Sequence, residues 1–114
     1  MTQYVPDAGD LIWLDFDPQA GHEQAGRRPA LVLSSWRFNR KASLAFVCPV
    51  TSKIKGYASE VPLPPGAAIH GAVLCSHLRS VDWKVRNPAL IGKAPDDVLL
   101  AVREVVASIA GIAP

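Results

Sequence analysis

A basic segment between Gln24 and Ser59 contains the residues of this sequence that most directly suggest chemistry. It holds seven lysines and arginines and no acidic residue, although the whole chain has a net charge of only +2. If the strands that these residues flank are adjacent, they form a positive surface suited to phosphate groups. Solvated strand ends produce the same pattern, so charge alone leaves nucleic-acid binding and an ordinary surface equally open. The seven residues are Arg27, Arg28, Arg37, Arg40, Lys41, Lys53 and Lys55.

Other residues that could act as nucleophiles, proton carriers or metal ligands are few and scattered. Cys48 and Cys75 lie in apolar stretches without metal-ligand spacing, which favours two buried thiols, with a disulfide as the alternative. No ligand cluster is visible, so neither a metal nor a cofactor is expected. The three histidines, His22, His70 and His77, would suit an acid and base pair of the pancreatic ribonuclease type, but no spacing pairs two of them.

Short strands are predicted to position most of these residues. Alternating or β-branched apolar runs, separated by glycine and proline turns, indicate a small antiparallel barrel or sandwich. Pro49 lies inside one run and cannot donate a hydrogen bond to a neighbouring strand, so a bulge or a free edge is expected there. The runs cover residues 10–16, 29–34, 43–51, 60–63, 72–75, 78–81 and 90–91.

One helix is predicted after Pro95, close to the end of the chain. Two acidic residues complement its dipole, and apolar residues from Val98 to Ile109 repeat at helical spacing until Gly111 ends the helix. Its apolar stripe is expected to cover a face or an open end of the barrel, because such a helix is not stable alone. The predicted fold class is therefore mainly β with a C-terminal helix, in one domain spanning residues 1–114.

The distribution of apolar residues bears on location and assembly. The chain does not open with a basic start and an apolar run, and no apolar stretch approaches the roughly 20 residues needed to cross a bilayer, so we expect a cytoplasmic protein that does not bind membranes. An apolar fraction of 49% in 114 residues favours a homodimer. We expect Trp13 in the core, and Trp36 and Trp83 in either the core or a subunit interface.

Motifs spread over almost the whole chain resemble the MazF family of toxins. The matching segments, 6–18, 21–34, 48–52, 55–57 and 78–83, follow the order of the family. The resemblance implies a barrel of the Src-homology type with packed helices, a homodimer, and sequence-specific, metal-independent cleavage of single-stranded mRNA that inhibits translation and growth. It also implies a MazE-like antitoxin as partner, and binding to operator DNA only as the toxin-antitoxin complex.

The resemblance also implies three catalytic residues. Arg28 matches the catalytic arginine of the family, and its guanidinium stays charged and can bind two phosphate oxygens at once. Thr51 matches the active-site threonine, whose hydroxyl can donate to a phosphate oxygen, with Ser52 as a partial substitute. Glu23 corresponds to a family acid that takes or relays the proton of the attacking 2′-hydroxyl.

RNA binding further requires basic groups for the backbone and flat side chains for stacked bases. The pair Ser76 and His77 stands where relatives often carry another polar dipeptide, so we expect it to alter the RNA sequence preference. The predicted RNA-binding residues are Phe16, Gln24, Arg27, Ser52, Lys53, Lys55, Tyr57, Ser76, His77 and Arg86. The alternatives are a non-catalytic toxin that binds DNA gyrase, as in the related CcdB family, and an inactive binding module; Arg28 and Thr51 favour the nuclease.

Overall fold

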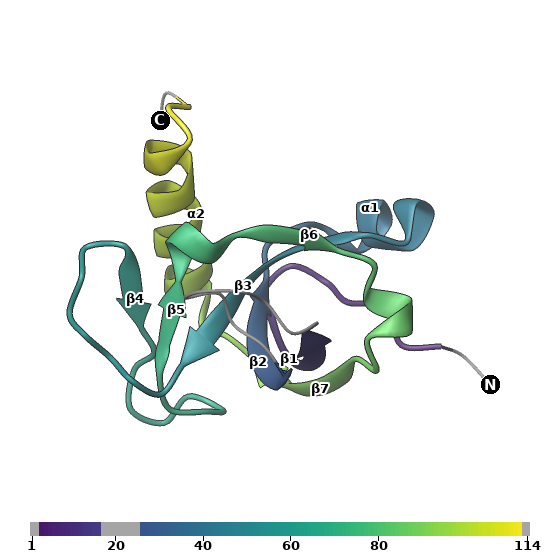
Figure 1. Cartoon of the computed structure of the whole chain (residues 1–114), viewed down its shortest axis with the longest axis horizontal. Helices are drawn as coiled ribbons and strands as arrows, with labels where there is room; N and C mark the ends of the chain where they lie inside the picture. Colours follow the sequence, from purple (N-terminus) through teal and green to yellow (C-terminus); the bar gives the residue numbers. More distant parts are fainter. Residues whose placement is uncertain (1–2, 17–25, 113–114) are drawn as a thin grey trace.

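A computed structural model describes residues 3–16 and 26–112 of the chain. In this part of the chain the elements are mostly short strands, with a short first helix and a longer second helix (Figure 1). The fold class predicted from the sequence, mainly β with a C-terminal helix, is confirmed. In chain order the elements are β1 (Asp10–Phe16), β2 (Gly26–Val32), α1 (Trp36–Ala42), β3 (Ala45–Thr51), β4 (Glu60–Pro62), β5 (Ala72–Leu74), η1 (Cys75–His77), β6 (Arg79–Val81), η2 (Trp83–Val85), β7 (Ala89–Lys93) and α2 (Asp96–Ile109).

The strands form one antiparallel sheet in the order β4-β5-β3-β2-β1-β7, with β6 also paired to β3. Within the described residues this path stays open between β4 and β7, a small difference from a closed barrel. Along one side, β3 pairs with β6 from Ala45 to Val47 and with β5 at Val50 and Thr51. Pro49 lies between the stretch of β3 that pairs with β6 and the stretch that pairs with β5. On this side of β3 its backbone therefore faces no neighbouring strand of the described residues, which agrees with the predicted free edge. We call β4, β5 and the end of β3 the short-strand half of the sheet.

Both faces of the central strands are buried, by two separate clusters of apolar residues. The helix-side cluster includes Leu11 and Leu31 of the sheet with Val98 and Val102 of α2. The barrel cluster lies on the other face and is built around the fully buried Trp83. Each fully buried aliphatic side chain stabilises the fold by about 1.5–3 kcal/mol. Because apolar clusters cover both faces of the central strands, these strands are nearly continuous apolar runs.

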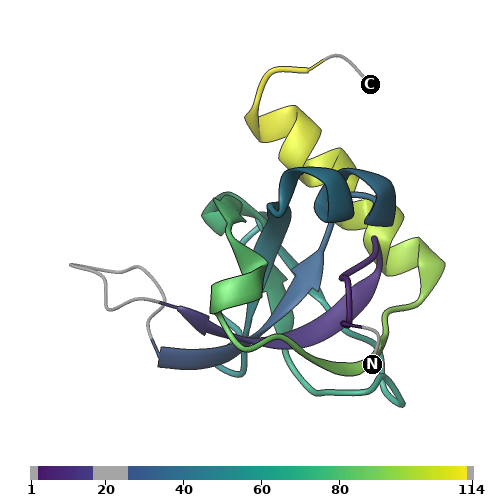
Figure 2. The same cartoon turned by 90° about the vertical axis from the view of Figure 1, so that its right-hand side faces the viewer.

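The predicted C-terminal helix is confirmed as α2, and it covers the helix-side cluster with its buried residues Val98 and Val102. Arg103 fixes the helix to the sheet, because its guanidinium donates a hydrogen bond of 2.8 Å to the carbonyl oxygen of Leu33. Gly111 follows the helix with a φ of +73°, which glycine adopts without strain. Figure 2 shows both helices above the strands, with α2 crossing behind α1. No helix of residues 3–16 and 26–112 is long and apolar enough to span a membrane.

The prediction that Trp13 belongs to the core is wrong, because its side chain is 39% exposed. Successive side chains of a strand point to opposite faces, so Leu11 lies in the helix-side cluster whereas Ile12 and Leu14 lie in the barrel cluster. Trp13 therefore points away from the barrel cluster. Of the two tryptophans left open, Trp83 is in the core and Trp36 is exposed.

Helix α1 had no counterpart among the elements expected along the chain. The Ser35 hydroxyl caps it by accepting from the Phe38 N–H at 3.5 Å, and Ser43 ends it in the left-handed region with a φ of +56°. Its buried residue is Asn39, whose carbonyl oxygen accepts from the Trp83 indole N–H at 3.1 Å. The helix therefore positions the tryptophan at the centre of the barrel cluster.

Candidate nucleic-acid interface

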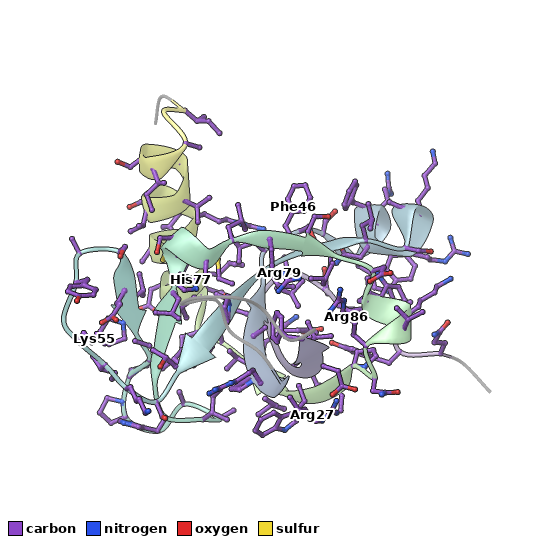
Figure 3. The ribbon with its side chains drawn as sticks, in the orientation of Figure 1. Arg27, Phe46, Lys55, His77, Arg79 and Arg86 are labelled. Carbon is purple, nitrogen blue, oxygen red and sulfur yellow. The ribbon has the colours of Figure 1, made fainter. Side chains whose placement is uncertain are left out.

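A cleft of about 450 Å³ lies in the short-strand half of the sheet, where β3 ends. It brings together six of the residues predicted from the sequence, drawn from two segments that are about 20 positions apart. Figure 3 shows Lys55 and His77 at the end of the molecule that carries β4 and β5. The residues that line the cleft are Thr51, Lys53, Lys55, Tyr57, Ser59, Glu60, Leu74, Ser76 and His77.

Thr51 is the last residue of β3 and is only 8% exposed. Its hydroxyl oxygen accepts a hydrogen bond of 3.1 Å from the Lys53 N–H, which turns the chain out of the strand. On the other side Gly71 lets the segment leading into β5 approach closely, because a Cβ there would lie 2.5 Å from the Thr51 carbonyl oxygen. The threonine is thus held on both sides, with its hydroxyl at the cleft.

The loop after Thr51, residues 52–57, carries the basic and aromatic side chains of the cleft. Its side chains are exposed, and Gly56 has a φ of +79° that permits the tight turn. One carboxylate oxygen of Glu60 accepts from the N–H groups of Lys55 and Gly56, at 3.0 and 2.8 Å. The loop therefore presents two lysines and a tyrosine from a backbone that is tied to β4, which suits phosphates and stacked bases.

The pair Ser76 and His77 reaches the cleft from the turn η1. The first residue of this turn, Cys75, is buried in the helix-side cluster, and its N–H donates to the Ser59 carbonyl oxygen at 3.0 Å. Ser76 is exposed and His77 is half-buried, so both offer polar groups beside the loop. The sequence prediction that these two residues accompany Lys53, Lys55 and Tyr57 is consistent with this arrangement.

Arg28 lies at the end of the sheet where β2 begins, and its residue is exposed. The last pair between β2 and β3 is Ala30 with Pro49, and Arg28 and Thr51 each lie two residues beyond it. Both candidate catalytic residues are therefore at the same end of one antiparallel strand pair. Arg28 is not among the residues that line the cleft.

Arg27 is tied to the neighbouring strand β1. Its guanidinium forms an exposed ion pair of 2.9 Å with Asp15, and the Asn87 amide donates to the same carboxylate at 2.7 Å. The hydrogen bond from Asn87, followed by that from Arg27, lowers the pKa of Asp15 below its ordinary value. Asp15 therefore stays charged and keeps its ion pair with Arg27, which does not line the cleft.

Arg27 and Ser52 do not line the cleft, and two further predicted RNA-binding residues, Phe16 and Arg86, are held elsewhere. Phe16 is 3% exposed and belongs to the barrel cluster, with the Arg79 guanidinium 5.2 Å from its ring centroid. The Arg86 side chain is 13% exposed, pairs with Asp82 at 3.0 Å and donates to the Asp15 carbonyl oxygen at 3.1 Å. Figure 3 places Arg79 and Arg86 along the barrel, away from Lys55. Burial explains why neither Phe16 nor Arg86 presents its polar or flat face to the cleft.

Three of the residues named from the sequence, His22, Glu23 and Gln24, lie outside the described residues. Sequence reasoning in turn missed Glu60, which lines the cleft and holds its loop. The available signal was its position as the first acidic residue after the acid-free basic segment.

Neither metal-ligating clusters nor reactive thiols contribute to the described part of the cleft. In residues 3–16 and 26–112, no group of three or more His, Cys, Asp or Glu residues could hold a metal ion. Cys48 and Cys75 are free and buried, as predicted. Burial raises the pKa of Cys48 to about 12 and that of Cys75 to about 11, so neither is a nucleophile near neutral pH.

A small curved sheet with a cleft of lysines, hydroxyls, an imidazole and an exposed tyrosine has the features of a protein that binds single-stranded nucleic acid. Comparison with known proteins narrows this class. The family model of the PemK-like, MazF-like toxins of type II toxin-antitoxin systems matches residues 7–110, so the chain belongs to this family.

Individual relatives are similar to this chain along nearly its whole length. The endoribonuclease toxin MazF of Escherichia coli is 44% identical over 101 residues, which cover 88% of this chain and 90% of that protein. The crystal structure of MazF (Form-I) from Deinococcus radiodurans is 53% identical with a TM-score of 0.91, over 96% of this chain and 99% of that chain. A MazE-MazF structure (Form-II) from the same organism is 52% identical with a TM-score of 0.88, over 97% and 100%.

Proposed function

We propose that this chain is the toxin of a type II toxin-antitoxin system and acts as a sequence-specific endoribonuclease on single-stranded mRNA, which inhibits translation and growth. The observation that carries the proposal is the cleft at the end of β3, which gathers Thr51, two lysines, an exposed tyrosine and His77. The family match and the relatives named as endoribonucleases support the same activity.

In the proposed reaction the 2′-hydroxyl of the substrate is the nucleophile, so no metal is needed to generate one. Its oxygen forms a bond to phosphorus while its proton passes to the Glu23 carboxylate, the acid that the family resemblance assigns. The bond from phosphorus to the 5′-oxygen breaks, and that oxygen takes a proton from water. Arg28 stabilises the charge that develops on the phosphate, and the Thr51 hydroxyl donates to one of its oxygens.

Binding is proposed to divide between backbone and base contacts. Lys53 and Lys55 bind phosphates, and the exposed ring of Tyr57 stacks on a base. Ser52, Ser76 and His77 contact base edges and phosphate oxygens, which makes the pair in η1 the main source of sequence preference.

The decisive test incubates the purified protein with a long unstructured RNA in EDTA and maps the new ends. We expect cleavage at one short sequence, and a loss of about 100- to 1000-fold in rate for Arg28→Ala, because removing one charge-stabilising donor has this effect. Arg37→Ala is the matched control, since Arg37 is an exposed arginine on α1 that does not line the cleft. An inactive wild-type protein would refute the proposal and direct the search to gyrase binding.

A homodimer is part of the proposal, formed through an apolar patch on the outer face of β3 and β6. Phe46 is 44% exposed, and its ring lies 5.5 Å from that of Phe38. The pairing of Phe46 with Ser80 puts Leu44 and Leu78, both exposed, on the same face. Figure 3 shows Phe46 projecting from this face between the two helices. A second copy that covers this patch removes exposed apolar surface from water.

An antitoxin is the second proposed partner. The MazE-MazF structures from Deinococcus radiodurans have high similarity to this chain over almost its full length, which supports a MazE-like partner here. We propose that this partner covers the cleft, that operator DNA is bound only by the joint complex, and that both act in the cytoplasm, where the mRNA substrate is present. Co-purification of the two chains and a DNA-binding assay with and without the antitoxin test these points.

A further inference from the structure

Glu60 is the one acidic side chain among the described residues that line the cleft. A carboxylate at this position repels the phosphates of an RNA strand, so its presence beside two lysines requires a compensating role. Its hydrogen bonds indicate what that role is. They are directed at the backbone of the loop, and neither lysine of the cleft forms an ion pair with it.

The contacts of Glu60 close the loop at three points. Its Oε1 atom accepts from the N–H groups of Lys55 and Gly56, at 3.0 and 2.8 Å. Its own N–H donates to the Tyr57 carbonyl oxygen at 3.0 Å. Hydrogen bonds to a charged acceptor are about twice as strong as neutral ones, and two of them here meet on one oxygen. The tip of an otherwise exposed loop is thereby fixed.

The other end of this connection is the sheet. Glu60 begins β4 and pairs with Leu74 of β5, and β5 in turn pairs with β3 at Thr51. The carboxylate therefore links the loop to the same strands that hold the candidate catalytic threonine. Without it, two neighbouring N–H groups of the loop would turn to water, and the side chains between Thr51 and Ala58 would sample many orientations.

We propose that Glu60 is a positioning residue, whose carboxylate holds the loop 52–57 so that Lys53, Lys55 and Tyr57 face the RNA. This inference rests on the proposed function, because it names how the substrate-binding loop of that site is ordered. In this role the Oε1 atom of Glu60 accepts from the loop backbone, and the role is separate from accepting a proton from the substrate. Preorganisation of this kind lowers the entropy lost on binding, so its removal weakens binding more than turnover.

Two substitutions separate the hydrogen bonds from the charge. Glu60→Gln keeps an acceptor oxygen at the same reach, whereas Glu60→Ala removes it. The control is Glu104→Ala, which deletes an exposed carboxylate on α2, outside the cleft. For each variant, amide hydrogen exchange of Lys55 and Gly56 is measured by NMR, together with KM and kcat on a short RNA and Kd for its uncleavable 2′-deoxy analogue.

We expect Glu60→Ala to lose exchange protection at both amides and to raise KM and Kd about 10-fold with kcat within twofold of the wild type. Glu60→Gln should retain the protection and most of the affinity, and Glu104→Ala should match the wild type. A fall in kcat at unchanged KM would overturn the proposal in favour of proton transfer by Glu60. Unchanged protection in Glu60→Ala, or a glutamine variant as weak as the alanine one, would also overturn it.

The exchange and Kd measurements do not depend on cleavage. If the wild-type protein binds the analogue but does not cut RNA, the proposed nuclease activity fails while the role of Glu60 in ordering the loop is still decided. If cleavage is normal and the amides are equally protected in all variants, the positioning role alone fails.

Discussion

Replacing Gly71 with alanine tests how closely the chain must approach Thr51. Gly71 has a φ of +146°, and a Cβ would lie 2.5 Å from the Thr51 carbonyl oxygen and 2.9 Å from the Val50 Cγ1 atom. A side chain in this backbone region costs about 1–3 kcal/mol. Overpacking against a backbone atom that cannot rotate away adds about 1–3 kcal/mol. The expected loss in the free energy of unfolding is therefore about 2–6 kcal/mol, or roughly 8–24 °C in Tm at about 4 °C per kcal/mol.

The same clash displaces the end of β3, so RNA cleavage should fall about 10-fold at a temperature where the variant remains folded. Thermal unfolding followed by circular dichroism and a cleavage assay at 15 °C measure the two effects. Gly66→Ala is the matched control, because Gly66 also has a positive φ, +86°, but a Cβ there meets no atom within 4 Å. Equal Tm values for the two variants would refute the argument that contact with Thr51 dominates.

Three further outcomes are expected. Iodoacetamide at pH 8 should label Cys48 and Cys75 only after unfolding, because raised pKa values of about 12 and 11 cut the thiolate fraction about 100- to 1000-fold; labelling of the folded protein would contradict this. Asn39→Ala should lower the free energy of unfolding by about 2–4 kcal/mol in urea titrations, because it leaves the Pro6 carbonyl oxygen without its donor; a loss below 1 kcal/mol would oppose this. Phe46→Glu should convert the dimer to a monomer in gel filtration, and an unchanged elution volume would count against the proposed interface.

Sequence reasoning located most strands because apolar runs between turns mark them well, but it could not fix how each strand faces. In β1 the apolar residues are so dense that the sequence does not show which of them face inward. Only the structure shows that Ile12 and Leu14 belong to the barrel cluster and that Trp13, between them, points away from it. Helix α1 spans seven residues, too few for a helical period to be visible. Only its cap at Ser35 was a local signal.

The site shows the same division between local and long-range information. Thr51, Lys53, Lys55 and Tyr57 lie within seven consecutive positions of the chain, so one turn suffices to bring them to a common cleft. Arg86 behaves differently because one of its partners, the carbonyl oxygen of Asp15, lies 71 residues away. Likewise, the burial of Phe16 depends on packing with strands distant in the chain, which no spacing reveals.

The change of partners along β3 has a consequence for how new substrate preferences can arise. The residues proposed to read RNA belong to a six-residue loop that leaves β3 at Thr51 and to a three-residue turn that follows β5, the strand that pairs with β3 beyond Pro49. The packing around Trp83 lies before that point, on β6 and the longer strands. Substitutions in the loop and turn therefore leave the tryptophan's surroundings intact. Related proteins can therefore evolve different RNA sequence preferences while the packing around Trp83 stays unchanged.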